Sequence, residues 1–211
     1  MANEPREIVR YTANQRLNHW LIALSFVLLA ISGLALFHPA FFWLSNVLGG
    51  GTWTRILHPF IGVVMFVSFF SFALRLWRDN RMTAEDRAWL KAVPKVISHE
   101  EQGVPEAGRY NGGQKLLYWV LIVLMIGLLV SGVLMWRAYF TFPVEVLRWS
   151  SLLHALFAFV LICAIIVHAY AGIWVKGSVR AMTRGTVTPG WAYKHHRKWY
   201  RKKMRDSSTL K

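Results

Sequence analysis

Cysteine is almost absent from the sequence, which contains only Cys163. A single thiol cannot close an internal disulfide, and it cannot supply the several thiolates that hold an iron–sulfur cluster. No Cys-x-x-Cys-His motif occurs, so covalent attachment of a haem is excluded as well. Any haem in this chain would have to be held non-covalently.

Charge is also scarce, because charged residues make up 17% of the 211 residues, against about 25% in an average soluble domain. Asp, Glu, Lys and Arg are missing from four long stretches, 17–54, 56–74, 116–136 and 149–175. A helix needs about 20 apolar residues to cross a membrane, so this pattern excludes a soluble enzyme. It predicts an all-α membrane protein, a single four-transmembrane-helix bundle domain over residues 1–211, with spans at about 17–37, 53–77, 114–136 and 147–175 and a tail at 176–211.

The positive charges are distributed unevenly along the chain. Of the 25 Lys and Arg residues, 3 precede the first span, 8 lie from Arg75 to Lys115, in and next to the loop between the second and third spans, and 11 lie in the tail. The other two loops hold only Arg55, Arg137 and Arg148. The positive-inside rule then predicts an N-in/C-in topology. The net charge of +15 indicates anionic lipids as partners and argues against nucleic acid.

Acidic side chains are missing from most of the membrane-spanning sequence. No Asp or Glu lies between Arg16 and Arg75 or within 116–136. A proton channel or transporter would usually carry an intramembrane carboxylate, so the sequence disfavours that class of protein. Together with the single cysteine, the same absence argues against a non-haem metal site.

Histidine is the ionisable residue that the spans do contain. His19, His58, His154 and His168 lie in or at the edge of spans, where ionisable side chains are costly and are candidates for function. His58 and His154 lie close to the external loops, and His19 and His168 lie close to the cytoplasmic segments. Two histidines at matched depth on different helices can ligate one haem iron from opposite faces. The sequence therefore predicts two bis-histidine b haems, one near each membrane surface.

The fourth span carries one histidine of each pair on nearly the same side. His154 and His168 are 14 residues apart, which is about 21 Å of helix rise with an angular offset of only about 40°. Small residues follow three of the histidines at the fourth position, Gly62, Ala158 and Gly172, so a flat porphyrin could lie beside each ring. The alternative is that these histidines are polar helix contacts and the small residues serve helix packing. The remaining histidines lie in loops or the tail, and we expect them to be solvated: His38, His99, His195 and His196.

The loops carry weaker signals. The external loop contains an apolar segment at 41–44 that could form an interfacial helix. Thr83 followed by Asp86 resembles a capping box, and a short amphipathic helix follows it, interrupted by Pro94. Internal repetition is limited to one faint echo, Ile31-Ser32-Gly33 and Val130-Ser131-Gly132.

Motifs spread over nearly the whole chain resemble one known family. The motifs are Arg10-Tyr11-Thr12, Arg16-Leu17-Asn18-His19-Trp20, Arg55-Ile56-Leu57-His58-Pro59-Phe60, Arg109-Tyr110-Asn111-Gly112-Gly113-Gln114-Lys115, Trp174-Val175-Lys176-Gly177 and Lys194-His195-His196-Arg197-Lys198-Trp199-Tyr200. Together they resemble the gamma subunit, a cytochrome b556, of respiratory membrane-bound formate dehydrogenases. Histidines at such depths also occur in the related b-type cytochromes of membrane hydrogenases and thiosulfate reductases.

The resemblance implies specific site residues. It implies an outer haem b on His58 and His154 and an inner haem b on His19 and His168, the same pairing that depth predicts. It also implies a quinone site, for menaquinone or ubiquinone, at Asn111, Gly113 and Gln114 together with His168. Asn and Gln amides supply hydrogen-bond donors for a quinone carbonyl, although Asn-Gly-Gly is also a signal for a turn and a helix start. Gly112 departs from the family's pattern, where we expect a bulkier residue.

The function that the resemblance implies is electron transfer, in a multi-pass protein of the bacterial cytoplasmic (inner) membrane. An iron–sulfur subunit would deliver electrons from a molybdenum- or tungsten-containing catalytic subunit, and this chain would pass them to quinone at the cytoplasmic side. We expect no catalytic residues and no formate-oxidising site in the chain itself. The alternatives are the b-type cytochrome subunit of a membrane-bound hydrogenase and a non-redox membrane anchor subunit.

Overall fold

The structure is a computed structural model that describes residues 7–98, 100 and 102–208. It contains two compact units. The first, which we call the span unit, consists of residues 17–74 and 120–169. The second holds the described residues outside those ranges, and we call it the basic unit because the sequence outside the span unit contains 22 of the 25 Lys and Arg residues.

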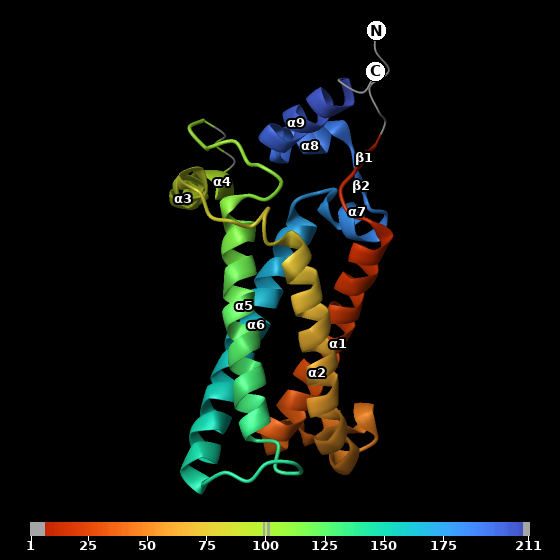
Figure 1. Cartoon of the computed structure of the whole chain (residues 1–211), viewed down its shortest axis with the longest axis vertical. Helices are drawn as coiled ribbons and strands as arrows, with labels where there is room; N and C mark the ends of the chain where they lie inside the picture. The colour runs from red at the N-terminus through yellow and green to blue at the C-terminus, as the bar shows by residue number, and fades with distance from the viewer. Residues whose placement is uncertain (1–6, 99, 101, 209–211) are drawn as a thin grey trace. The chain divides into compact units, whose positions relative to one another are not determined.

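Four long helices supply the span unit, in which they run side by side (Figure 1). They have 25, 26, 23 and 31 residues and a mean hydropathy of 2.0–2.6, so each is long and apolar enough to cross a membrane. This confirms the predicted four-helix membrane protein. The helices are α1 (Ala13–Phe37), α2 (Gly51–Leu76), α5 (Gly112–Leu134) and α6 (Val144–Trp174).

All four helices begin earlier than predicted, and reciprocal polar caps stabilise the starts of two of them. At α1, the backbone N–H of Gln15 donates to Thr12 Oγ1 at 3.3 Å, and the N–H of Thr12 donates to Gln15 Oε1 at 3.0 Å. At α5, the N–H of Gln114 donates to Asn111 Oδ1 at 2.9 Å, and the N–H of Asn111 donates to Gln114 Oε1 at 3.1 Å. Such reciprocal caps satisfy backbone donors that a helix start leaves unpaired.

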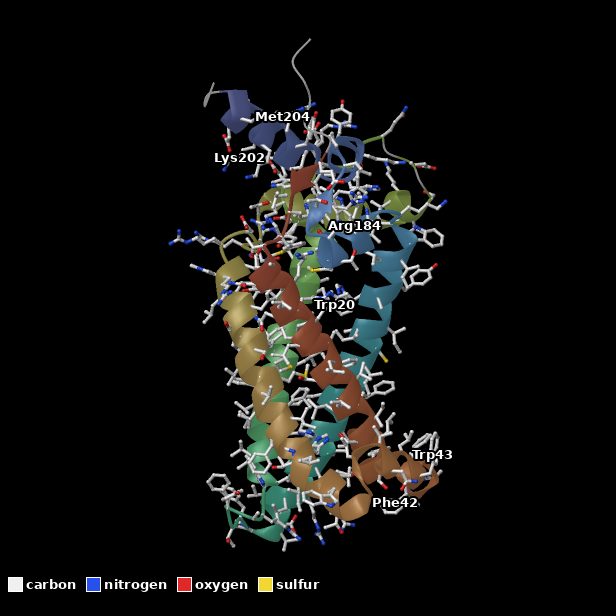
Figure 2. The ribbon with its side chains drawn as sticks, turned by 90° about the vertical axis from the view of Figure 1, so that its right-hand side faces the viewer. Trp20, Phe42, Trp43, Arg184, Lys202 and Met204 are labelled. Atoms are coloured by element: carbon white, nitrogen blue, oxygen red, sulfur yellow. The ribbon has the colours of Figure 1, made fainter. Side chains whose placement is uncertain are left out.

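A 3₁₀ helix, η1 (Pro39–Leu48), connects α1 to α2. It contains the segment for which the sequence predicted a short helix, and it is longer than expected. The His38 side chain caps it by accepting from the N–H of Ala40, and Gly49 ends it with a positive φ of 87°. Phe42 and Trp43 are 50% and 67% exposed, and Figure 2 shows both on the surface of η1.

The basic unit is built from short elements. An antiparallel pair of strands, β1 (Ile8–Val9) and β2 (Thr186–Val187), joins its first and last parts, with Ile8 opposite Val187. The Thr83–Asp86 capping box predicted from the sequence is present at α3 (Ala84–Lys91), and Pro94 lies in the first turn of the next helix, α4 (Val93–Ile97). The remaining helices are α7 (Ser178–Thr183), α8 (Pro189–His195) and α9 (Arg197–Ser208). Lys202 and Met204 lie on α9 (Figure 2).

The core of the basic unit corrects one prediction about the histidines. His196 is only 2% exposed, so the expectation that it is solvated was wrong. Of the other histidines expected in solvent, His38 is exposed, His195 is half-buried, and His99 lies outside the described residues. The buried apolar residues around this core are Ile8, Tyr11, Tyr110, Val187, Ala192 and Trp199.

Candidate functional site

The structure brings the four membrane histidines together as two pairs, both within the span unit. The ring centroids of His58 on α2 and His154 on α6 are 6.4 Å apart, with ring planes at 65°. The centroids of His19 on α1 and His168 on α6 are also 6.4 Å apart, with ring planes at 55°. These are the pairs that membrane depth predicted. Helix α6 contributes one histidine to each pair.

The spacing of each pair fits one metal ion between two imidazoles. At metal–imidazole bond lengths of about 2 Å, two facing nitrogens lie roughly 4 Å apart, and the half-widths of the two rings make up the rest of the 6.4 Å. The environment of His19 is apolar and aromatic, with Trp20 at 5.5 Å and Phe72 at 6.3 Å between centroids. Its Nδ1 atom is buried and has no hydrogen-bond partner among the described residues. The donor set therefore suits a haem iron with two histidine ligands.

A serine holds each ring of the first pair. Ser32 Oγ on α1 lies 2.7 Å from His58 Nδ1, and Ser131 Oγ on α5 lies 2.9 Å from His154 Nδ1. Each hydroxyl also donates to the carbonyl four residues earlier in its own helix, at 2.7 Å for Leu28 and 2.6 Å for Gly127. A hydroxyl has only one proton to donate. With that proton on the helix carbonyl, each histidine donates from Nδ1–H to the serine oxygen, and its Nε2 is left available to a metal.

Glycines follow both serines and lie against the same rings. A Cβ at Gly33 would be 3.5 Å from His58 Cε1, and a Cβ at Gly132 would be 3.3 Å from His154 Cε1. Sequence reasoning chose other small residues, of which Gly62 would approach only Leu29, at 4.0 Å. The Ser-Gly pairs are therefore site residues that the sequence reasoning missed, although the echo of 31–33 in 130–132 was a visible signal for them.

Three of the four residues implied for a quinone site, Asn111, Gly113 and Gln114, belong to the basic unit, and His168 belongs to the span unit. Asn111 and Gln114 cap α5 through their amide oxygens, so the helix-start interpretation of this motif is correct. Their amide N–H₂ groups remain as donors, so capping and quinone binding are compatible. A side chain at Gly113 would meet Trp89 at 3.1 Å, and one at Gly112 would meet the Asp86 carbonyl oxygen at 2.5 Å. Close packing of α3 on α5 thus explains the glycine that departs from the family's pattern.

A buried ion pair fixes that packing. Lys115 Nζ donates to Asp86 Oδ2 at 2.7 Å and to the Arg81 carbonyl at 3.1 Å. Burial raises the pKa of Asp86, but hydrogen bonds from Lys115 and Thr83 outweigh it and leave that pKa below its usual value. A cavity of about 170 Å³ lies beside the pair, lined by Thr83, Glu85, Asp86, Trp89, Pro105, Glu106, Ala107, Gly108, Gly112, Lys115 and Lys198.

Two Arg-Tyr motifs meet in the core of the basic unit. Arg10 Nη2 donates to the Arg109 carbonyl at 2.7 Å, and Arg109 Nη2 donates to the Arg10 carbonyl at 3.0 Å. His196 Nδ1 donates to the Gly108 carbonyl at 2.9 Å, and its Nε2 lies 3.3 Å from Arg10 Nη2. Burial, followed by the charge of Arg10, lowers the pKa of His196 to about 3. Four rings lie 5.0–5.7 Å from the Arg10 guanidinium carbon, those of Tyr11, Tyr110, Trp191 and Trp199.

Comparison with known proteins agrees with this architecture. A family model described as prokaryotic cytochrome b561 matches residues 10–185. The cytochrome b556(fdo) subunit of formate dehydrogenase from Escherichia coli K12 is 48% identical over 92% of both chains. A formate dehydrogenase cytochrome b556 subunit of Haemophilus influenzae is 42% identical over 97% of this chain and 86% of its own. The nitrate-inducible cytochrome b556(Fdn) subunit of E. coli K12 is 39% identical over 94% and 93% of the two chains. The chain therefore belongs to the prokaryotic cytochrome b561 family, in which it is similar to cytochrome b556 subunits of formate dehydrogenases, and it is a multi-pass protein of the bacterial inner membrane.

Proposed function

We propose that this chain is the di-haem b cytochrome subunit of a formate dehydrogenase, and that it passes electrons from an iron–sulfur partner across the membrane to a quinone. The observation that carries the proposal is the pair of histidine sites with the same 6.4 Å spacing. The similarity to formate dehydrogenase subunits supports this complex over a membrane hydrogenase. Paired imidazoles in an apolar bundle support an electron carrier over a non-redox anchor.

Each histidine has a defined part in this proposal. His58 and His154 would hold an outer haem b, and His19 and His168 an inner one, with a haem supplying a one-electron carrier when bound. Each imidazole would offer a neutral ring nitrogen to the haem iron, and the apolar helices would keep water away from both sites. Formate oxidation would take place in a molybdenum- or tungsten-containing partner. This chain would serve only as the quinone-reducing part of the complex.

Quinone would bind at the start of α5. The free amide N–H₂ groups of Asn111 and Gln114 can donate to a quinone carbonyl, while their oxygens stay on the backbone of the capping box. Gly113 keeps this turn close to Trp89. The resemblance also implies His168, which belongs to the span unit. The quinone would be menaquinone or ubiquinone, and its protons would come from the cytoplasm.

The proposed orientation is N-in/C-in, with the basic unit on the cytoplasmic side. Its many Lys and Arg residues follow the positive-inside rule and would attract anionic lipid headgroups. A reporter fused after Lys211 should therefore be active in the cytoplasm, and one inserted into Gly49–Gly51 should be active outside. A C-terminal reporter active only outside would reverse the assignment of the outer and inner haems.

Haem content tests the proposal directly. We expect pyridine haemochrome quantification to find two haems b per chain, and one in each of His58→Ala, His154→Ala and His19→Ala. The first two variants should lose the same haem, because they remove opposite ligands of one iron. His38→Ala is the matched control, since this exposed histidine caps η1 and should leave both haems. An inserted His58→Ala protein with two haems would remove His58 from the ligands.

A further inference from the structure

The two histidine pairs differ in what stands behind their rings. The Nδ1 atoms of His58 and His154 each lie within hydrogen-bond distance of a serine oxygen, at 2.7 Å and 2.9 Å. His19 Nδ1 is buried without such an acceptor among the described residues, and no serine contact to His168 occurs in the same part of the chain. The spacing of the rings is nevertheless the same, 6.4 Å in both pairs. The two histidine pairs thus have the same spacing, but only the His58–His154 pair has a serine at each Nδ1 atom.

We propose that Ser32 and Ser131 are positioning residues that fix the ring orientation of His58 and His154, present Nε2 to the iron, and lower the reduction potential of that haem below that of the other. This inference rests on the proposed function, because it requires haem at both pairs. It assigns to the serines a role beyond helix packing.

The hydrogen-bond pattern of each serine determines the direction of the effect. Each hydroxyl donates its proton to a carbonyl of its own helix: Ser32 to Leu28 at 2.7 Å and Ser131 to Gly127 at 2.6 Å. Its oxygen can then only accept from the histidine. A metal-ligating imidazole that donates its other N–H to an acceptor becomes a more basic ligand. A more basic ligand favours the ferric over the ferrous state, so the potential of that haem falls.

The packing around the serines makes this contact rigid. Ser32 and Ser131 are only 1% and 4% exposed, so water does not compete for either oxygen. Gly33 and Gly132 let the rings lie directly against α1 and α5, at 3.5 Å and 3.3 Å from the position of a Cβ. The same Ser-Gly arrangement therefore acts on both axial ligands of one iron and on neither ligand of the other.

A lower potential at the His58–His154 haem would serve the proposed electron flow. Electrons that enter at the outer haem and leave from the inner one move toward the negative side of the membrane, against the field. A potential difference of this sign between the two haems would offset part of that cost. The serines would thus supply a directional bias that the histidines alone do not provide.

Redox titration of the purified complex, followed separately for each haem, tests the proposal. In Ser32→Ala and Ser131→Ala we expect two haems per chain, with the potential of the His58–His154 haem raised. A threefold to tenfold change in its oxidised-to-reduced ratio at fixed potential corresponds to about 28–59 mV for one electron. The low-spin ferric signal of the same haem in electron paramagnetic resonance should shift, and the other haem should be unchanged.

Two further variants separate positioning from packing. Ser25→Ala is the matched control, because Ser25 is buried on the same helix, at 4% exposed, and makes no contact to a histidine within the described chain. It should change neither haem. Ser131→Thr keeps the hydroxyl and should restore the wild-type potential and spectrum.

The possible outcomes distinguish this inference from the proposed function. A wild-type complex without two haems would overturn the proposed function. Two bound haems with unchanged potentials and spectra in both serine-to-alanine variants would overturn only the role of the serines. Loss of haem from the site, with an unshifted potential in the fraction that remains, would assign the serines to packing and would also overturn it.

Discussion

The span unit and the basic unit bury different kinds of polar side chain. In the span unit the buried polar residues are all hydroxyl-bearing: Ser25, Ser32, Ser45, Thr54, Ser131 and Ser150. In the basic unit they are Arg10, Asn80, Asp86, Lys115 and His196. The two sets do not overlap in chemistry, although both units are built from helices of the same chain.

The difference follows from what each environment can satisfy. A hydroxyl in lipid can donate to the carbonyl four residues earlier in its own helix, as Ser32, Thr54 and Ser131 do at 2.6–2.9 Å, so it needs no partner from elsewhere. A buried charge needs a partner of opposite sign or a set of acceptors. The basic unit supplies these through Asp86 for Lys115 and through carbonyls and aromatic rings for Arg10.

The largest expected effect comes from breaking a buried pair in the basic unit. Lys115→Met leaves the Asp86 carboxylate buried without its cation, which should cost about 3–5 kcal/mol. Hydrogen exchange measured by mass spectrometry should show increased opening of α3 and the start of α5. Haem content should stay at the wild-type level, because the four histidines lie in the span unit.

The control for that variant is an ion pair in the span unit that faces water. Arg148 and Glu145 are 3.0 Å apart, and both side chains are 72% exposed. Arg148→Ala should cost less than about 1 kcal/mol. Equal protection from exchange in both variants would mean that the buried pair contributes no more than an exposed one, and the contrast between the units would fail.

The second effect concerns pH and is of intermediate size. The His196 imidazole has a pKa of about 3 in the folded chain against an ordinary value of 6.5, so below pH 6.5 the unfolded chain binds a proton that the folded chain does not. Stability is fully present above pH 6.5 and falls below it by about 1.4 kcal/mol per pH unit, which is at most about 2.7 kcal/mol between pH 6.5 and 4.5. Exchange protection of α8 and of the 105–110 loop should decrease accordingly.

His196→Gln sharpens the pH prediction, because an amide can still donate to the Gly108 carbonyl and accept from Arg10 but cannot titrate. The acid-dependent slope between pH 6.5 and 4.5 should become shallower in this variant. The span unit should show no matching slope in the same experiment. An unchanged slope would assign the acid sensitivity in this pH range to groups other than His196. Asp86 is not one of them, because its lowered pKa acts only at more acidic pH.

The smallest expected effect separates structure from function at the start of α5. Asn111→Asp and Gln114→Glu keep the oxygens of the capping box, remove the amide donors, and add a negative charge that a helix start favours. Each should weaken quinone binding by about 0.5–1.5 kcal/mol, a threefold to tenfold rise in the apparent quinone KM, with both haems bound and reducible. Alanine at the same positions should in addition weaken the helix start.

The equivalent capping box at α1 provides the control. Gln15→Ala removes the matching contact to the Thr12 N–H at a helix start for which we propose no quinone contact. It should leave the quinone KM unchanged. If Asn111→Asp and Gln114→Glu reoxidise at the wild-type rate with quinone limiting, these residues only cap the helix.

The long uncharged stretches of the sequence and the positions of the histidines within them predicted most of the fold. The four helices followed from stretches without charge, and the association of His58 with His154 and of His19 with His168 followed from depth alone. Depth is readable because the helix rise is fixed and the membrane boundaries are marked by charged residues. The Thr83–Asp86 cap was readable for a similar reason, since all of its contacts are local.

Contacts between distant segments were not readable in the same way. His196 looked solvated in a basic tail, and only its contacts with Gly108 and Arg10, which are 88 and 186 residues away, bury it. Ser32 looked like an ordinary small polar residue, because its partner His58 lies on another helix, 26 residues later. Sequence periodicity indicates which face of a helix is polar, but it does not identify the side chain that this face will meet.

The Ser-Gly pairs also affect how the bundle assembles. Ser32 and His58 belong to the hairpin of α1 and α2, whereas Ser131 and His154 belong to the hairpin of α5 and α6. Each hairpin can therefore orient its own ligand before the two hairpins meet, and the ordering of that ring need not await the metal. The His58–His154 site then consists of two half-sites, one in each hairpin. Each half-site contains a histidine and the serine that orients it, much as two subunits of a symmetric dimer each contribute half of a shared site.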